Sequence, residues 1–438
     1  MPSGLRRDLG TLESYAVIVG ILIGAGIFKV TGEAWLLTGP SVILGFLVLA
    51  PAVLATSVAY AVFLSTPLGS EPGGEYLHIS RTFGGRGLAF VGAWLKIIAY
   101  TGAIAYLAVA FADYSRQLFP RLTVMPLAIG SVVFFYAIHV AGVRWFGRLQ
   151  VWMCALLGVS ILVLIVPGIF AIDTANYRPF FTDGMAGFMA ALPPLFFAFA
   201  GFESLAQTAG EVRDSTRQLP RIFIRGVIAV TIIYLLMSAV GLGVLPGQQL
   251  RISPAPMAEA AARYLPAGAA GLVTLGALMA ITTSLNATML VPSRIAIVLA
   301  GDDLTPRWLG SVSPRTGTPI AGLTVTLAGA LTLLITNQIR LALDIAVFAI
   351  VLLYLLHSVA LLLLPKSNPE LYRAVTVSIP LAALRVAAVA SIAGMAALLT
   401  QMSSATFGLL LFWAALGAAL YAVARSRTAG RKEHSQQT

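Results

Sequence analysis

The feature that most constrains this chain is a succession of long apolar segments separated by short polar connections. A helix needs about 20 apolar residues to cross the roughly 30 Å of hydrocarbon in a bilayer. The sequence predicts twelve such membrane helices, over residues 11–37, 40–66, 86–115, 122–142, 149–172, 185–210, 221–246, 268–300, 318–336, 340–364, 378–402 and 404–425. The first segment is too long for a cleavable signal peptide, and a second one follows it directly.

The composition supports this interpretation. Charged residues make up 10% of the chain and hydrophobic residues 58%, whereas a soluble domain carries about 25% charged residues. The net charge of +11 does not indicate a nucleic-acid partner, because the basic residues are scattered between apolar runs. The single cysteine, Cys154, excludes a disulfide framework and a Cys-based metal site. The isolated His139 and His357 favour packing roles, so we expect no metal and no cofactor.

The basic residues also predict an orientation. Of 28 Lys and Arg residues, nineteen, with Arg294 among them, are assigned to the side of both termini, six to the other side, and Lys29, Lys96 and Arg385 to spans. Short cytoplasmic loops carry an excess of Lys and Arg. We therefore expect a multi-pass protein of the cytoplasmic (inner) membrane with both termini in the cytoplasm. The polar tail 426–438 is expected to be disordered.

Two predicted spans contain residues that weaken a helix. The first span has Gly20, Gly24 and Gly26 within seven residues, and the sixth has a double proline at 193–194 followed by Gly201. Each glycine costs up to about 1 kcal/mol relative to alanine inside a helix. Interrupted segments at matching positions of two halves indicate the binding site of an inverted-repeat transporter.

A break in a membrane helix creates a polar site. The freed N–H groups attract an anion such as a carboxylate, and the freed C=O groups attract a cation such as an ammonium. A zwitterionic α-amino acid satisfies both. Small residues also allow close helix packing, which would explain one such span alone, but two spans in register favour a substrate site.

Several short motifs, in this order along the chain, resemble the amino acid–polyamine–organocation superfamily. They are Ile23-Gly-Ala-Gly-Ile-Phe28, Pro72-Gly-Gly-Glu-Tyr76 with Arg81-Thr-Phe-Gly84, Phe197-Ala-Phe-Ala-Gly-Phe-Glu203, Ala209-Gly-Glu-Val212, Ser284-Leu-Asn286 and Asp302-Asp-Leu-Thr-Pro306. The resemblance implies an all-α fold of the leucine-transporter type, with two inverted five-helix repeats and two further helices. The parts would be a cytoplasmic N-terminus (1–10), the repeats (11–172 and 185–364) and the last two spans (378–425).

The resemblance also implies roles for individual residues. The backbone at Ile23, Gly24, Ala25, Gly26 and Ile27 would hold the substrate carboxylate and part of the ammonium. The segment Phe197, Ala198, Phe199, Ala200 and Gly201 would complete the ammonium site, with Phe197 as a gate on the outer side. Asn286 and Ser284 would lie on a scaffold helix that faces the first break. A sodium site would use the carbonyls of Gly20 and Ile23 and the hydroxyls of Thr283 and Ser284, although such hydroxyls more often bond nearby carbonyls.

Two ionisable residues within the spans need a reason, because an intramembrane charge costs at least about 2.5–3.5 kcal/mol. Glu203 either exchanges a proton during transport or braces the break. Lys96 either supplies a surrogate cation or binds the substrate carboxylate, or else it pairs with Glu203 or extends toward the interface. We assign both to proton coupling.

The sequence thus predicts a secondary transporter that moves neutral or apolar L-amino acids by alternating access, coupled to protons. Its partners would be the amino acid, H⁺ and membrane lipid; no oligomeric state is predicted. A sodium-independent exchanger or exporter, a cationic amino acid permease and an amino-acid-sensing receptor are alternatives. An enzyme is not expected, since neither a Gly-Xaa-Ser-Xaa-Gly turn nor a His-Glu-Xaa-Xaa-His motif occurs.

Overall fold

The computed structural model describes residues 4–250, 256–336, 338–401 and 404–436. Within these ranges the chain is built from helices, without a β-sheet. The longer helices are α1 (Thr11–Ala25), α3 (Val42–Leu64), α5 (Gly87–Leu118), α6 (Val124–Val140), α7 (Val143–Gly168), α8 (Gly184–Phe199), α10 (Ser215–Val244), α13 (Ala267–Gly301), α14 (Ile320–Ile335), α15 (Ile339–Ser367), α17 (Leu381–Leu399) and α18 (Ser404–Gln436). The shorter ones are α2 (Thr31–Thr38), α4 (Glu75–Phe83), α9 (Ser204–Gln207), α11 (Gly247–Leu250), α12 (Pro256–Tyr264) and α16 (Pro369–Arg373).

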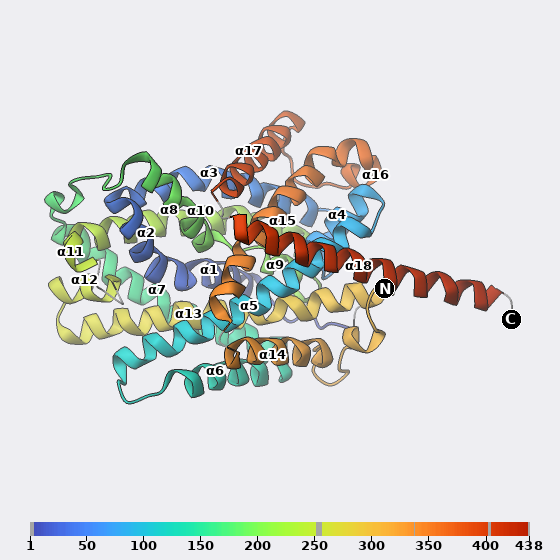
Figure 1. The fold of residues 1–438 in the computed structure, drawn as a ribbon, viewed down its shortest axis with the longest axis horizontal. Coiled ribbons are helices and arrows are strands. Elements are labelled where there is room, and N and C mark those ends of the chain that lie inside the picture. The colour runs from blue at the N-terminus through green and yellow to red at the C-terminus, as the bar shows by residue number, and fades with distance from the viewer. Residues whose placement is uncertain (1–3, 251–255, 337, 402–403, 437–438) are drawn as a thin grey trace.

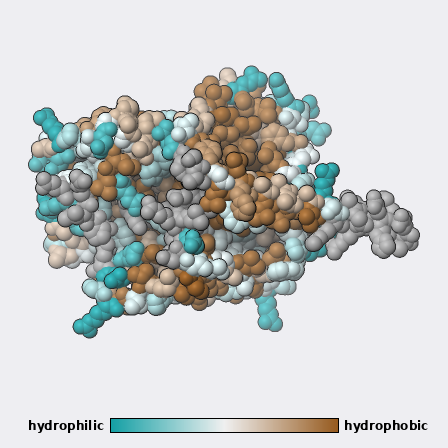
Figure 2. Space-filling model, in the orientation of Figure 1, coloured by the Kyte–Doolittle hydropathy of each residue, from teal (hydrophilic) through white to brown (hydrophobic). Residues whose placement is uncertain are grey.

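The predicted membrane helices are confirmed in type and order. Among the described residues, ten stretches are long and apolar enough to span a bilayer, and α6 and α14 are shorter apolar helices of 17 and 16 residues. Together they correspond to the twelve predicted segments. Hydrophobic side chains cover the face formed by α17 and the adjoining part of α18, while hydrophilic ones gather toward the two ends of the molecule (Figure 2). The chain is an all-α polytopic membrane protein of the leucine-transporter fold.

The helices run roughly along the long axis of the molecule (Figure 1). Both ends of the chain lie at one end of this axis, which we call the terminal side, and α11 and α12 lie at the opposite side. Helix α3 packs against α8 and α10, and α5 packs against α13 and α15. Helix α1 contacts α10 of the first set and α13 of the second, and it also contacts α7, so it lies between the two sets of helices. This central position places the first glycine-rich segment inside the protein.

The first predicted break is confirmed. Gly24 has φ 29° and ψ −155°, outside the helical region, although helical hydrogen bonding resumes immediately. A π-helical turn follows over Gly26–Val30, and α2 then continues toward the opposite side. Only glycine adopts such a positive φ without strain, which explains why the break falls at Gly24. The side chains of Ala25 and Lys29 lie outside the described part.

The second break is also present, but not at the prolines. Helix α8 continues through Pro193 and Pro194, and it ends at Phe199. Ala200 is extended, Gly201 has φ 108°, and helix resumes only at Ser204. Membrane helices tolerate interior proline because neighbouring groups satisfy the freed backbone carbonyls. The chain instead leaves the helix just after Phe199, where Gly201 takes a positive φ that glycine adopts without strain.

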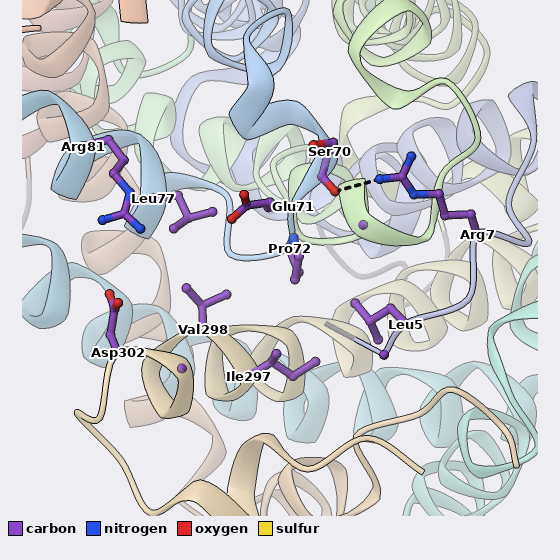
Figure 3. A pocket seen from close by; sticks show the side chains of 13 residues that line it. Leu5, Arg7, Ser70, Glu71, Pro72, Leu77, Arg81, Ile297, Val298 and Asp302 are labelled. Carbon is purple, nitrogen blue, oxygen red and sulfur yellow. Dashed lines mark hydrogen bonds between the residues drawn. The ribbon is translucent and has the colours of Figure 1, made fainter. Parts of the chain in front are cut away.

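The terminal side is closed by the start of the chain. Leu9 N–H donates to Glu211 O at 3.0 Å, and Arg213 N–H donates to Leu9 O at 2.9 Å, so the N-terminal segment is joined to the connection between α9 and α10. Beside it lies a hollow of about 580 Å³ (Figure 3), in which Arg7 donates to Ser70 O. The hollow is lined by Gly4, Leu5, Arg7, Ser70, Glu71, Pro72, Leu77, Arg81, Gly210, Ile297, Val298, Gly301 and Asp302.

The connection before α5 contains α4, and the connection between α10 and α13 contains α11 and α12. Two predictions, one about the C-terminal tail and one about Arg294, differ from the structure. The backbone of α18 stays helical to Gln436, where we expected a disordered tail; its Arg, Lys, Glu and Gln residues are good helix formers. Residues 437–438 lie outside the described part. Arg294 is not a loop charge: it lies within α13 and is buried.

Candidate functional site

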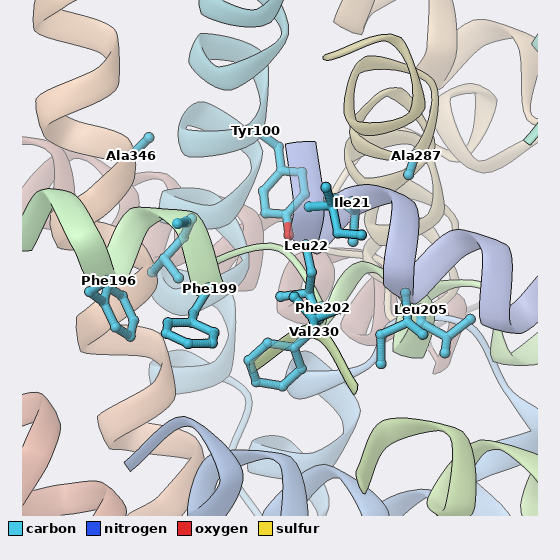
Figure 4. Close-up of a cluster of buried hydrophobic side chains, with 14 of the residues drawn as sticks. Ile21, Leu22, Tyr100, Phe196, Phe199, Phe202, Leu205, Val230, Ala287 and Ala346 are labelled. Atoms are coloured by element: carbon cyan, nitrogen blue, oxygen red, sulfur yellow. The ribbon is translucent and has the colours of Figure 1, made fainter. Parts of the chain in front are cut away.

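The two breaks face a common cavity of about 50 Å³. Gly24 and Gly26 contribute from the first break, and Ala198, Ala200 and Gly201 from the second. The remaining wall is mainly apolar and is formed by Ile21, Leu22, Tyr100, Ala103, Leu107, Phe197, Ser284, Thr288 and Ile350. The surrounding core includes Ile21, Leu22 and Phe202, and Phe196 and Phe199 lie next to each other on α8 (Figure 4). The cavity therefore combines irregular backbone with apolar side chains.

The glycines at the first break permit very close approach. A Cβ atom on Gly24 would collide with the hydroxyl of Ser284 in α13. A Cβ atom on Gly26 would lie 2.6 Å from the Cα of Ala198. The first broken segment thus meets the backbone of the second directly and the Ser284 side chain of α13. Ile23 and Ile27, which flank the glycines, are buried in the core.

Phe197 lies where a gate is expected. It is half-buried, lines the cavity, and meets Tyr106 of α5 edge-to-face with ring centroids 5.9 Å apart. The contact joins the second broken segment to α5. The gating role itself stays a prediction.

Tyr234 of α10 is a site residue that sequence reasoning missed. Its hydroxyl bonds the carbonyl of Leu22 at the first break and lies 2.6 Å from the carbonyl of Ala198 at the second. Tyr234 is completely buried. A buried carbonyl left without a donor costs free energy, so this hydroxyl stabilises the ends of both broken segments. From the sequence alone, a tyrosine that bonds backbone carbonyls in an apolar span cannot be distinguished from one that only packs.

Three of the four groups of the possible sodium site lie together, namely the Gly20 carbonyl and the hydroxyls of Thr283 and Ser284. Thr283 Oγ1 and Ser284 Oγ lie 3.0 and 3.1 Å from the carbonyl of Gly20, but Thr283 Oγ1 is also 2.8 Å from the carbonyl of Ala280, and Ser284 Oγ is 3.0 Å from that of Ile21. The hydroxyls thus bond the backbone oxygens directly. The carbonyl of Ile21, rather than that of Ile23, takes part in these hydrogen bonds.

Asn286 lies on α13 as expected, in a buried polar network behind the first break. Its side-chain amide donates to Gln150 Oε1 at 2.8 Å, and Gln150 Nε2 lies 3.2 Å from the carbonyls of both Ala16 and Thr283. Its backbone carbonyl contacts His139 Nε2 at 2.9 Å. The network fixes α1 to α7 and α13 on the terminal side of the break.

Glu203 follows the second break and is completely buried. Its carboxylate accepts hydrogen bonds from the hydroxyls of Tyr100 at 2.5 Å and Tyr354, and from the Gly201 N–H at 3.0 Å. Glu203 therefore braces the irregular backbone at Gly201 and joins it to α5 and α15. This contact agrees with a bracing role and leaves proton exchange as a prediction.

Lys96 does not pair with Glu203 in this structure. Its Nζ lies 2.7 and 2.8 Å from the two carboxylate oxygens of Glu75, the first residue of α4. Both side chains are buried. The alternative in which Lys96 extends toward the interface is also wrong, because Glu75 reaches it from a connection that folds back into the protein. Glu75 lies outside the predicted spans, so its burial beside Lys96 was not expected.

Two further buried contacts differ from expectation. Arg294 forms a two-point ion pair with Glu211, with distances of 2.7 and 3.2 Å. His357, expected to lie alone, is 2.9 Å from His78 of α4. Burial lowers the pKa of His78 to about 3, and the charge of Lys96 contributes, so His78 is neutral at physiological pH.

The geometry described above occurs in a chain whose sequence matches a known family model. The model described as "Amino acid permease" matches residues 9–422. The chain belongs to the amino acid permease family. The resemblance to the amino acid–polyamine–organocation superfamily is thereby confirmed, and the permease is a multi-pass membrane protein that transports amino acids.

Characterised relatives of the permease differ in substrate. It is 27% identical to the branched-chain amino acid permease BcaP of Bacillus subtilis, over 84% of this chain and 83% of the relative. It is 25% identical to the methylthioribose transporter of the same organism, over 84% and 83%. It is 30% identical to the chloroplastic cationic amino acid transporter 9 of Arabidopsis thaliana, over 71% of this chain and 58% of the relative.

Proposed function

We propose that this permease is a secondary active transporter that moves L-amino acids with apolar side chains across the cytoplasmic membrane, driven by protons. The observation that carries the proposal is the cavity between the two breaks, where Gly24 and Gly26 meet Ala198 and Gly201. Irregular backbone offers N–H and C=O groups for the charged ends of a zwitterion. The substrate side chain then faces the apolar wall.

The wall favours a neutral, apolar side chain over a cationic one. Among the described residues that line the cavity, none is acidic. The nearby Glu203 is already bonded by two tyrosines and a backbone N–H. A cationic side chain would lack a carboxylate partner in this wall, and an unpaired buried charge is costly. The relative named as a branched-chain amino acid permease supports the same choice.

Protons are favoured over sodium as the coupling ion. The hydroxyls of Thr283 and Ser284 bond the Gly20 carbonyl directly, so a sodium ion would have to replace these hydrogen bonds. Glu203, by contrast, is a buried acid in direct contact with the second break. Its protonation would turn an oxygen acceptor into a donor, and the Gly201 N–H requires an acceptor. Binding a proton at Glu203 would thus loosen the backbone that forms the substrate site.

Alternating access would expose this cavity to one side at a time. The excess of Lys and Arg assigned to the terminal side makes that side cytoplasmic. We propose that Phe197 controls access from the outside, and that the joined N-terminal segment and α9–α10 connection close the cytoplasmic side.

Uptake into liposomes tests this function. Purified permease is reconstituted, and uptake of labelled L-leucine is measured with and without an inward proton gradient. We expect the gradient to drive accumulation, a protonophore to abolish it, and excess L-lysine to leave it unchanged. Uptake only into liposomes preloaded with an amino acid would instead indicate an exchanger. Binding of leucine without uptake would indicate a receptor.

A further inference from the structure

A second buried polar cluster lies on the terminal side of the cavity and has no part in the substrate site. Its centre is the carboxylate of Glu75, which Lys96 contacts at 2.7 and 2.8 Å. Gln207 Nε2 donates to Glu75 Oε2 at 2.8 Å, and the hydroxyl of Tyr60 donates to Oε1. We call these four residues the Glu75 cluster. They come from α4, α5, α9 and α3, so one carboxylate joins four helices.

The backbone of the connection is shaped to make these contacts. Gly73 and Gly74, just before α4, have φ values of 110° and 45°. Residues other than glycine rarely adopt such positive values. A Cβ atom on Gly74 would collide with the side-chain nitrogen of Gln207. The two glycines therefore let the start of α4 lie directly against α9, and they place the Glu75 carboxylate beside Gln207.

The partners of Glu75 fall into two groups. Helix α4 packs against both α5 and α15, so Glu75 and Lys96 belong to one packed unit. Tyr60 belongs to α3, which packs against α8 and α10, and Gln207 ends α9, the part of the second broken segment nearer the terminal side. The ion pair with Lys96 thus holds the Glu75 carboxylate in place on α4. The two hydrogen-bond donors to this carboxylate, Tyr60 and Gln207, come from other helices.

The cluster lies between the substrate cavity and the terminal side. Pro72 and Leu77, on either side of Glu75 in sequence, line the large hollow there, as does Gly210, three residues after Gln207 (Figure 3). Glu203, beside the cavity, immediately precedes the short helix that Gln207 ends. A path from the cavity into the hollow therefore requires α9 to separate from α4.

Helix α9 carries polar atoms that this conformation leaves unsatisfied. Gln207 Oε1 and Ser204 Oγ are both buried without a hydrogen-bond partner. Buried polar atoms are normally paired, and an unpaired one costs free energy. Both atoms lie on the one four-residue helix that connects the second break to the Glu75 cluster.

We propose that Glu75, fixed by Lys96, is a latch that must release Gln207 and Tyr60 before the substrate cavity opens to the terminal side. This inference rests on the transport function proposed above and adds positioning residues to it. The groups that face the carboxylate are Lys96, Tyr60 and Gln207, and the paired rings of His78 and His357 lie adjacent to Tyr60.

The test removes the donors and leaves the ion pair intact, because a variant of Glu75 or Lys96 alone would leave a buried charge unpaired and threaten folding. Cys154 is the only cysteine, so a Cys154→Ser background permits single reporters. Ser204→Cys reports access from the terminal side, and Ala103→Cys, in the cavity wall, reports access from the opposite side. A membrane-impermeant thiol reagent is applied to vesicles of each orientation.

We expect Gln207→Met to raise the labelling rate at position 204 from the terminal side by about tenfold, the effect of losing one hydrogen bond to a charged group. Tyr60→Phe should act in the same direction. Labelling at position 103 from the opposite side should fall, which a merely loosened fold would not produce. The control is Gln218→Met. It removes an amide on the same side of the protein that is bonded to Thr11, and it should change neither labelling rate.

Unchanged rates in both folded variants, or a rise on both sides, would overturn the latch. The same preparations are assayed for leucine uptake without the latch substitutions. A protein that transports no amino acid would refute the proposed function, whereas the ratio of the two labelling rates would still report on the latch. The two failures are therefore distinguishable.

Discussion

Gly26 touches Ala198 across the space between the two broken segments. A Cβ atom on Gly26 would lie 2.6 Å from both the Cα and the Cβ of Ala198, closer than non-bonded carbon atoms approach. Because Ala198 offers backbone here, it cannot move aside like a flexible side chain. The hydrogen atom of Gly26 is thus what allows the ends of α1 and α8 to share one cavity.

A methyl group at this point should therefore disable transport. We expect Gly26→Ala to lower leucine uptake by about tenfold or more, and Gly26→Leu to abolish it, because overpacking pushes the two breaks apart. Membrane insertion should be unaffected. Gly130→Ala is the matched control, since a Cβ at Gly130 meets open space. Full uptake by Gly26→Leu would remove the argument for a site at the breaks.

Glu203→Gln should uncouple uptake from the proton gradient. The amide still accepts one hydrogen bond with its oxygen but cannot gain or lose a proton. Leucine should then equilibrate across the liposome membrane without accumulating when an inward gradient is applied. Glu33→Gln, an exposed acid in α2, should keep the dependence. If Glu203→Gln still accumulates leucine like the wild type, another group carries the proton.

Tyr234→Phe should weaken substrate binding without preventing folding. The change removes the one O–H donor that the carbonyls of Leu22 and Ala198 share, and a buried carbonyl left without a donor costs about 1–3 kcal/mol. We expect the KM for leucine to rise about tenfold or more. The control is Tyr136→Phe, whose exposed hydroxyl contacts Thr324. An unchanged KM would mean that Tyr234 only packs.

Replacing sodium should leave uptake unchanged. The hydroxyls of Thr283 and Ser284 lie within hydrogen-bond distance of the Gly20 carbonyl, so a sodium ion at this place would have to displace these contacts. Leucine uptake driven by a proton gradient is compared in sodium, potassium and choline chloride at equal ionic strength. A sodium-dependent rate that is lost in Ser284→Ala would show that the cation does bind there.

Much of the fold followed from the sequence because the physics of the bilayer is simple. A run of apolar residues long enough to cross the hydrocarbon predicts a helix. The glycines at 24 and 26 correctly indicated the position of the first break. In the sixth span the sequence indicated a break within the segment that holds Pro193, Pro194 and Gly201. The helix continues through the prolines and ends before Gly201, whose positive φ a side chain would oppose.

The polar contacts were harder to predict, because they join residues far apart in sequence. Lys96 stood out as a buried charge, yet its partner Glu75 lies in a connection that looked like part of a loop. Tyr234, Tyr354 and Gln207 lie in apolar surroundings and read as packing residues. Their hydroxyl and amide groups matter only because the tertiary fold brings a carbonyl or a carboxylate within reach.

The most direct measurement of the central claim compares three ligands that share one apolar side chain. Calorimetric binding to the purified permease is measured for L-leucine, for 3-methylbutylamine, which lacks the carboxylate, and for 4-methylpentanoate, which lacks the ammonium. If the ends of the two broken helices hold both charges, leucine alone should bind, and Gly26→Leu should abolish that binding. Comparable binding of the amine or the acid, or leucine binding that survives Gly26→Leu, would contradict the account.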